Sequence, residues 1–346
     1  MPKRDDLTPR ERQVLEAVVR SYIDSAEPAG SRSIAKAFPL GVSAATVRNT
    51  MSDLEDRGYL SHPHTSAGRV PTDQAYRVYV DSLIWEPAIS FRDENTLRRE
   101  LGSGRSAIED ILRKAAQVLG LLTQELGVAV APTLASGLLE RLELVQVASD
   151  RLLLVLVFKG GAARTIFIEV RSQLPRDVVA SVSAVLNERL AGLSLSELRR
   201  TLRERLRDTV GGPPEQELLN VFVEEAEQIF DVGADDGAAV LLGSAQMLAE
   251  QPEFHSNEQM RALLELTERR DVLQRALARR RTPGLSVTIG AENIDPKLAQ
   301  FTIVTSAYHS ESLSGVIGVM GPTRMPYHKV IALVEYTSRL MSNFTQ

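Results

Sequence analysis

The chain has 346 residues, a formal net charge of −5 and no cysteine, which excludes disulfides, thiolate metal sites and cysteine nucleophiles. Its 43% hydrophobic and 25% charged residues are typical of a soluble globular protein, and its length predicts two or three domains. Because it opens without the apolar core of a signal peptide and holds no apolar run approaching the ~18 residues of a membrane span, we expect a cytoplasmic protein.

Three helices are expected near the N-terminus. Thr8 and Glu11 have the spacing of a capping box, and apolar residues follow them at helical intervals. Ser31 is expected to cap a short second helix and Ser43 a third, because proline and glycine residues interrupt the chain before each of them.

The third helix is predicted to have two chemically different sides. Its buried stripe consists of Ala44, Val47, Met51 and Leu54. The opposite side carries Ala45, Asn49 and Ser52, with Thr46 and Arg48 on the flanks. Because arginine suits guanine edges and asparagine suits adenine edges in a major groove, this side favours base recognition over an ordinary surface helix.

A hairpin is expected after the third helix. Residues 59–62 and 69–72 are interpreted as short strands around a loop, and a further helix should run from Asp73 to about Trp85. Helix, turn, helix and hairpin in this order predict a winged helix-turn-helix DNA-binding domain. We expect Arg69 to reach a backbone phosphate or a narrow minor groove, with a solvated hairpin arginine as the alternative.

The charge distribution favours one face of this domain for DNA. Residues 1–83 contain equal numbers of basic and acidic residues, but residues 28–52 contain Arg32, Lys36 and Arg48 and no acid. We therefore expect modest non-specific affinity for DNA. The residues expected to contact DNA are Ser31, Arg32, Ser43, Ala45, Thr46, Arg48, Asn49, Ser52, His64, Thr65, Ser66 and Arg69.

The remainder of the chain alternates between strand and helix patterns. A polar stretch at 87–106 is followed by a helix and then by strands at 142–148, 151–158 and 165–170. From about residue 175 to residue 281 the pattern is almost wholly helical. Further strands are expected at 285–289, 301–308 and 315–320, and a final helix at 327–341.

Two blocks of strands around a helical block suggest an α+β domain with a second domain inserted into it, so the fold class is α+β and multidomain. The predicted boundaries are a DNA-binding domain at 1–86, a linker at 87–106, an α+β domain formed by 107–172 and 282–346, and a mostly helical insert at 173–281. Within the insert, a wide apolar stripe is a candidate dimerisation face, with an internal core helix as the equal alternative. The stripe includes Leu219, Phe222, Val223, Ile229 and Phe230.

No catalytic or metal-binding constellation is evident. His62 and His64 have no third ligand nearby, so a structural or phosphate-contacting role is favoured over metal binding. The remaining histidines lack the partners of a nucleophile–base pair. We therefore expect neither an enzyme nor a bound cofactor or metal.

Two other motifs have ordinary structural explanations. Gly315, Gly318 and Gly321 resemble a phosphate loop only superficially, and close strand packing with a turn explains them better. The arginine run 279–281 is a possible anion patch, but it is better explained as a complement to the negative end of a helix.

Three segments carry a more distinctive pattern: Gly41–Asn49, Pro63–Thr72 with Tyr76–Asp81, and Gly318–Met325. With them the chain resembles, nearly from end to end, the HrcA family of heat-inducible transcription repressors of bacterial chaperone operons. The segment that starts at Pro63 is the most diagnostic, since an ordinary winged helix does not need it. The chain departs from the family at Thr50, Ala75 and Pro326, where an acid, a glycine and an aspartate are usual, and the last departure removes a polar cap from the final helix.

The resemblance implies a winged-helix domain, a GAF-like domain and an inserted dimerising domain. It also implies a homodimer that binds the inverted repeat called CIRCE before the groE and dnaK operons. The resemblance further implies that repression depends on the GroEL chaperonin, which heat is expected to occupy with other clients. Two heads fixed in a dimer would engage symmetric half-sites together, which compensates for weak binding by each.

Three other hypotheses remain open at this point. The first is a repressor that senses a small metabolite through the GAF-like domain. The second is an enzyme that uses the α+β domain, which the lack of a catalytic constellation disfavours. The third is a protein-interaction scaffold with incidental DNA binding, which a comparison of specific and random duplexes would test.

Overall fold

The computed structural model describes residues 7–63, 67–83, 89–101, 108–131, 137–159, 163–170, 174–209, 211–230, 240–278, 280, 284–310 and 313–343. The predicted mixture of helices and sheets is confirmed. The chain folds into two compact units: unit 1 comprises Met1–Val130, Val240–Ala307 and Val316–Leu340, and unit 2 comprises Ala131–Ala239, Tyr308–Gly315 and Met341–Gln346. Among the described helices, none combines the length and the apolarity needed to cross a membrane.

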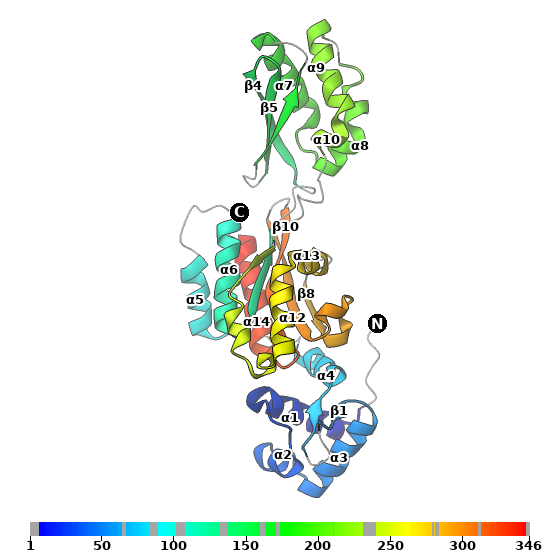
Figure 1. Cartoon of the computed structure of the whole chain (residues 1–346), viewed down its shortest axis with the longest axis vertical. Coiled ribbons are helices and arrows are strands. Elements are labelled where there is room, and N and C mark those ends of the chain that lie inside the picture. The colour runs from blue at the N-terminus through cyan, green and yellow to red at the C-terminus, as the bar shows by residue number, and fades with distance from the viewer. Residues whose placement is uncertain are drawn as a thin grey trace. The chain divides into compact units, whose positions relative to one another are not determined.

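Unit 1 begins with the N-terminal segment, residues 7–83. Its elements are α1 (Pro9–Ser25), α2 (Ser31–Ala37), α3 (Ala44–Asp56), β1 (Leu60–Ser61), β2 (Val70–Pro71) and α4 (Asp73–Leu83), with β1 and β2 antiparallel (Figure 1). The capping box at Thr8 and the N-cap at Ser43 are both present, as predicted. The expected cap at Ser31 is wrong: Gly30 is the N-cap of α2, and Ser31 is the first helical residue.

A small apolar core holds the N-terminal segment together. Ile34 of α2, Val47 and Leu54 of α3 and Tyr76 of α4 are all nearly inaccessible to solvent. Each of these residues lies on the apolar side of its amphipathic helix, so burial of that side fixes the orientation of the polar side. The polar side of α3 is thereby directed outward.

The main sheet of unit 1 has five strands in the order β7-β3-β10-β9-β8. These are β3 (Leu126–Val130), β7 (Val240–Leu242), β8 (Leu285–Ile289), β9 (Phe301–Ser310) and β10 (Leu313–Pro322). Strand β3 pairs antiparallel with β10 and β7, and β8 pairs antiparallel with β9. Strands β3 and β7 are not predicted from the sequence, because short apolar runs beside helices do not by themselves distinguish strand from helix.

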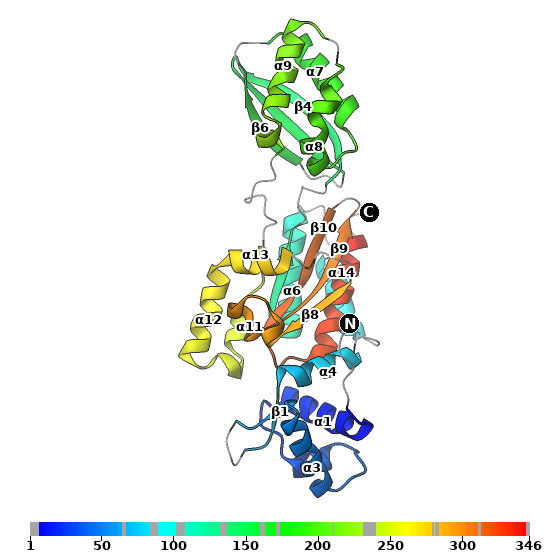
Figure 2. The same ribbon diagram turned by 90° about the vertical axis from the view of Figure 1, so that its right-hand side faces the viewer.

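Helices cover this sheet. Figures 1 and 2 show α14 (Tyr327–Asn343) and α12 (Asn257–Glu268) on opposite sides of it, with α13 (Arg270–Ala278) following α12. Helix α6 (Ile108–Thr123) approaches β3 so closely that a side chain at Gly127 would collide with the backbone of Ala116. Gly318 likewise has no room for a side chain against β9, which agrees with the packing role predicted for it.

The predicted linker at 87–106 is partly wrong, because it contains helix α5 (Phe91–Leu101). Leu97 and Leu101 are buried, whereas most of the other side chains of α5 are polar and at least partly exposed. A helix that buries only a narrow stripe has the overall composition of a linker. Residues 102–107 lie outside the described residues.

Unit 2 is built on a three-stranded antiparallel sheet, β4 (Leu139–Ala148), β5 (Arg151–Phe158) and β6 (Ala163–Glu169), in the order β4-β5-β6. One face of this sheet packs against α7 (Arg176–Leu190), α8 (Leu195–Leu206), α9 (Pro213–Glu224) and α10 (Ala226–Ile229). The sequence pattern predicts these strands in the same domain as β8–β10, with an insert that starts at residue 173. The structure instead places the strands with helices α7–α10, and it places α12 and α13 in unit 1.

The predicted dimerisation stripe lies inside unit 2. Phe222 and Phe230 are fully buried, and Leu219 and Ile229 nearly so, in one cluster with the inner face of the sheet. Val223 is partly buried against the same cluster. An exposed face for a second copy is therefore wrong for these five residues, and the alternative of an internal core helix is correct.

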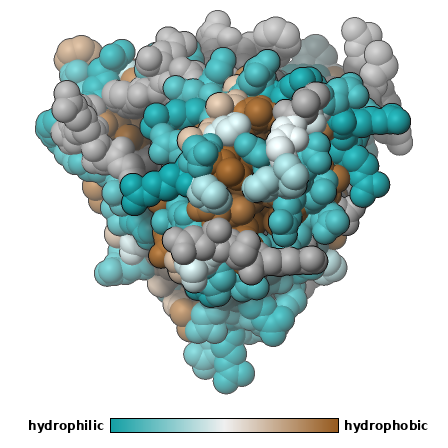
Figure 3. Space-filling model, turned by 90° about the horizontal axis from the view of Figure 1, so that it is seen from above, coloured by the Kyte–Doolittle hydropathy of each residue, from teal (hydrophilic) through white to brown (hydrophobic). Residues whose placement is uncertain are grey.

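The other face of this sheet is open and carries exposed apolar side chains among charged ones. Val145, Val147 and Phe167 are 45%, 49% and 64% exposed, and the Phe167 ring lies 5.8 Å from the guanidinium of Arg151. Seen from above in Figure 3, the surface is largely hydrophilic with a group of apolar side chains near its centre. Contiguous apolar groups of this kind are candidates for contact with another macromolecule.

Candidate nucleic-acid interface

Helix α3 presents an exposed polar face. Ala45, Arg48, Asn49 and Ser52 are all exposed. Among the described residues, none forms an ion pair with Arg48, so its guanidinium is available to a ligand. The sequence predicts this face, since the buried stripe of an amphipathic helix determines where the remaining side chains lie.

Two of the predicted DNA contacts also stabilise the start of α3. The Ser43 hydroxyl accepts a hydrogen bond from the Thr46 backbone N–H at 3.2 Å, and the two side-chain hydroxyl oxygens lie 3.0 Å apart. Their second function as caps limits how freely they can bind a phosphate. Arg32 of α2 is exposed, and Ser31 beside it is partly buried.

Arg69 of the hairpin is neither fully exposed to solvent nor available to DNA in this structure, because its guanidinium is held within the protein. Arg69 forms an ion pair with Glu55 of α3 at 2.7 Å, and only 18% of its side chain is exposed. Its backbone also exchanges hydrogen bonds of 2.8 and 3.0 Å with Ala29. Glu55 further lies 3.6 Å from His62. The ion pair of Glu55 with Arg69 is not predicted from the sequence, because only the folded hairpin brings the two residues together. The other predicted hairpin contacts, His64, Thr65 and Ser66, lie outside the described residues.

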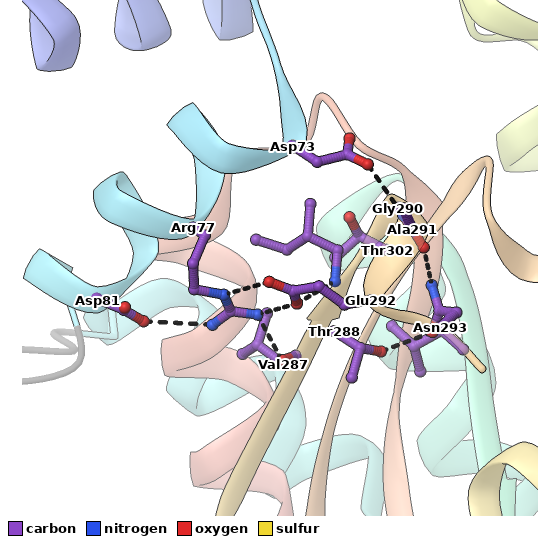
Figure 4. Close-up of polar contacts among 12 residues, drawn as sticks. Asp73, Arg77, Asp81, Val287, Thr288, Gly290, Ala291, Glu292, Asn293 and Thr302 are labelled. Atoms are coloured by element: carbon purple, nitrogen blue, oxygen red, sulfur yellow. Dashed lines mark hydrogen bonds and ion pairs between the residues drawn. The ribbon is translucent and has the colours of Figure 1, made fainter. Parts of the chain in front are cut away.

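Helix α4 connects this face to the main sheet of unit 1. The Arg77 guanidinium donates to Glu292 through Nε at 2.8 Å and through Nη2, and Nη2 also donates to the Val287 carbonyl at 2.7 Å (Figure 4). Its Nη1 donates to Asp81 at 3.3 Å. Hydrogen bonds to the two carboxylates raise the pKa of Arg77 and oppose the effect of its burial.

A second contact fixes the start of α4. The Asp73 carboxylate accepts a hydrogen bond from the Ala291 backbone N–H at 2.9 Å (Figure 4). Gly290, with φ at +51°, lies directly against this carboxylate, which leaves no room for a side chain there. The short 3-10 helix η4 (Gly290–Glu292) therefore holds both Asp73 and Arg77 of α4.

A third contact joins α1 to the segment after β10. Arg324 binds Glu253 through Nε and through Nη2 at 3.1 Å, and its Nη1 donates to the Ile23 carbonyl at 2.8 Å. The ring of Tyr327 lies 5.7 Å from that of Tyr76. Arg77, Tyr76 and Arg324, which all belong to the segments that carry the family resemblance, each take part in a contact between the N-terminal segment and the rest of unit 1.

A buried acid lies near this junction. Glu125 is 1% exposed and accepts a hydrogen bond from Gln251 at 3.1 Å. Burial, the largest effect, raises the pKa of the Glu125 carboxyl well above its usual value. A side chain at Gly321 would collide with this carboxyl group, which is a more specific reason for that glycine than the turn predicted from sequence. Within the described ranges, no group of three or more His, Cys, Asp or Glu side chains is placed to hold a metal ion.

Comparisons with known proteins agree on one family. Residues 109–331 match the family described as HrcA protein C-terminal domain. A heat-inducible transcription repressor HrcA from Chlorobium phaeobacteroides (strain BS1) is 38% identical over 98% of each chain. One from Chlorobaculum tepidum is also 38% identical, over 97% of each chain.

A solved structure supports the fold alone. A crystal structure of a protein described only as hypothetical matches with a TM-score of 0.60 at 23% sequence identity, covering 98% of this chain and 99% of that one. The curated relatives carry the stronger information, because they exceed 30% identity over almost their whole length. The chain therefore belongs to the HrcA family, whose curated relatives are named as heat-inducible transcription repressors.

Proposed function

We propose that the chain is a sequence-specific DNA-binding repressor and that its N-terminal segment is a winged helix-turn-helix. The observation that carries the proposal is the outward face of α3, where Arg48 and Asn49 are exposed and Arg48 has no ion-pair partner among the described residues. Val47 and Leu54 anchor the opposite side of α3, so the exposed face is held in a fixed orientation. A helix held in this way can enter a major groove and read base edges.

The residues proposed to contact DNA fall into three groups. Arg48, Asn49, Ala45 and Ser52 would read bases, each good bidentate pair contributing about 1–3 kcal/mol of discrimination. Ser31, Arg32, Ser43 and Thr46 would bind phosphates and set the position of the helix. The proposed contacts in the hairpin are His64, Thr65, Ser66 and Arg69, and Arg69 would have to exchange Glu55 for a phosphate.

We further propose a homodimer, and we assign its interface to the open face of the β4-β5-β6 sheet. The stripe around Phe222 is used inside the unit, whereas Val145, Val147 and Phe167 are exposed on a sheet whose other face is covered. An apolar sheet face can pair with its own copy about a twofold axis, which matches two heads to an inverted repeat.

Family membership suggests the regulatory setting. We propose that the operator is the CIRCE inverted repeat before chaperone operons and that the GroEL chaperonin keeps the repressor active. The five-stranded sheet with its covering helices is proposed to be GAF-like, and the chain is proposed not to be an enzyme. The alternative is a repressor that senses a small metabolite through this GAF-like part.

Gel shifts with a CIRCE duplex test the proposal. Arg48→Ala and Asn49→Ala should each weaken specific binding by about 1–3 kcal/mol, roughly tenfold to a hundredfold, without changing the thermal unfolding of the protein. Arg10→Ala is the matched control, because Arg10 is also exposed but lies at the start of α1. Undiminished specific binding by both α3 variants would remove this helix from DNA recognition.

A further inference from the structure

A cavity in unit 1 is lined by a half-buried cation, Arg280, that has no ion-pair partner among the described residues. The cavity has a volume of about 440 Å³ and lies between α13, β8 and the segment from η4 to η5 (Pro296–Leu298). Arg280 lines it, and its guanidinium donates to the Ile303 carbonyl at 3.2 Å, to the Ala276 carbonyl at 3.3 Å and to the Thr288 hydroxyl. A weaker contact of 3.4 Å reaches the Asn293 amide oxygen.

All of these acceptors are neutral. Among the described residues, no carboxylate forms an ion pair with Arg280, and burial alone lowers the pKa of Arg280 to about 10. A desolvated charge that is held only by dipoles costs free energy, which an anion in the cavity would recover. The Arg280 guanidinium is also well suited to an anion, because its planar fork matches carboxylate and phosphate groups.

The two acids that line the cavity are already engaged. Glu292 accepts from Arg77 and from the Ile289 backbone N–H, and Asp295 accepts from the Lys297 backbone N–H. Arg275 at the same cavity is paired with Asp271 in an exposed position. Among the described lining residues, Arg280 is therefore the cation without an ion-pair partner, while Asp295, which accepts only from a backbone N–H, keeps its negative charge.

The remaining lining determines the class of ligand. It combines the hydroxyl groups of Ser286 and Thr288 with the apolar side chains of Val272, Leu298 and Ile294. Ile294 is 81% exposed, so most of its side chain is open to solvent and to a ligand. Convergent polar groups in a partly apolar cavity are typical of small-molecule sites.

We propose that this cavity binds a small organic anion, whose carboxylate or phosphate group pairs with Arg280 and whose apolar part lies against Val272, Leu298 and Ile294. Glu292 borders the cavity and also binds Arg77 of α4, so occupancy is expected to change the affinity for DNA. That consequence rests on the proposed repressor function, whereas anion binding itself does not.

The site is tested by titrating the full chain with benzoate, citrate and inorganic phosphate at constant ionic strength, following thermal unfolding. We expect a saturable stabilisation by at least one of these anions, and Arg280→Met should weaken the apparent affinity by about tenfold or more. Benzoate or citrate as the stabilising anion identifies a carboxylate ligand, and phosphate alone identifies the phosphate class. Arg270→Met is the matched control, since Arg270 is exposed at the start of α13, the helix that precedes Arg280.

A second variant keeps the test decisive if Arg280→Met does not fold. Ile294→Glu places a carboxylate at an exposed position of the lining, so the fold should be retained and the anion affinity should fall by a similar factor. The same response to every anion in the wild type and in both variants would overturn the site, because it would reflect a general salt effect. A saturable anion effect on stability without any change in operator affinity would overturn only the regulatory consequence.

Discussion

Helices α3 and α9 have similar sequence patterns and opposite uses. Both are amphipathic and of nearly equal length, Ala44–Asp56 and Pro213–Glu224. Helix α3 buries a narrow stripe and presents Arg48 and Asn49 to solvent, whereas α9 buries Phe222 completely against its own sheet. An apolar stripe therefore predicts that a helix face is buried, but it does not say whether its partner is the same chain or another one.

The contrast between these helices also indicates where a surface that binds another molecule can lie. The apolar stripe of α9 is the obvious candidate for a dimer contact from sequence, yet its residues are already used in the core. The open face of the β4-β5-β6 sheet has a weaker apolar pattern and remains accessible. The α9 stripe and the open sheet face therefore differ in their exposure after folding, and hydrophobicity alone does not distinguish them.

The largest predicted effect tests the buried side of this contrast. Phe222→Ala should lower the free energy of unfolding of unit 2 by about 3–5 kcal/mol, because it removes a fully buried ring and leaves a cavity. Chemical denaturation of the full chain measures the loss. Phe91→Ala is the matched control, since Phe91 is 80% exposed and its truncation should change stability by less than about 0.5 kcal/mol. Equal stability of both variants would contradict a core role for α9.

A charged substitution on the open face of the β4-β5-β6 sheet tests whether this face is the dimer interface. Phe167→Asp should weaken self-association by about 2 kcal/mol for each copy, because it places a carboxylate in an apolar contact that symmetry repeats. Sedimentation velocity over a range of concentrations measures the change, and Phe91→Asp is the control with the same substitution at another exposed position. A variant that remains as dimeric as the wild type would exclude this face from the interface.

The smallest predicted effect, a change in stability per pH unit, concerns the buried acid Glu125. The raised pKa of Glu125 means that its carboxyl remains protonated in the folded state at pH values where the unfolded chain has released the proton. Stability is then fully present below the unfolded pKa of about 4.3 and falls by up to about 1.4 kcal/mol per pH unit above it, until the pH passes the folded pKa.

Glu125→Gln should remove this contribution, so its stability advantage over the wild type should grow as the pH rises. Urea denaturation at several pH values from about 5 upward measures the slopes. Glu258→Gln provides the control, because Glu258 is exposed. Parallel slopes for the wild type and Glu125→Gln would show that Glu125 is ionised in the folded protein.

Much of the N-terminal segment could be predicted from local signals. The caps at Thr8 and Ser43 and the outward direction of Arg48 and Asn49 depend on residues within a few positions of each other. The strands β5, β8 and β9 were also predicted nearly in place, since each is a β-branched or leucine-rich run between turn signals.

Local sequence was sufficient for the family, the mixed fold class and the polar face of α3, because short-range periodicity and continuous motifs carry them. Four features required the folded chain: the sheet that each strand joins, the internal position of Phe222, the ion pair of Arg69 with Glu55, and the neutral partners of Arg280. These features depend on contacts between residues far apart in the chain or on the competition among several equally apolar surfaces. Periodicity reports the burial of a side chain but not the identity of its neighbour.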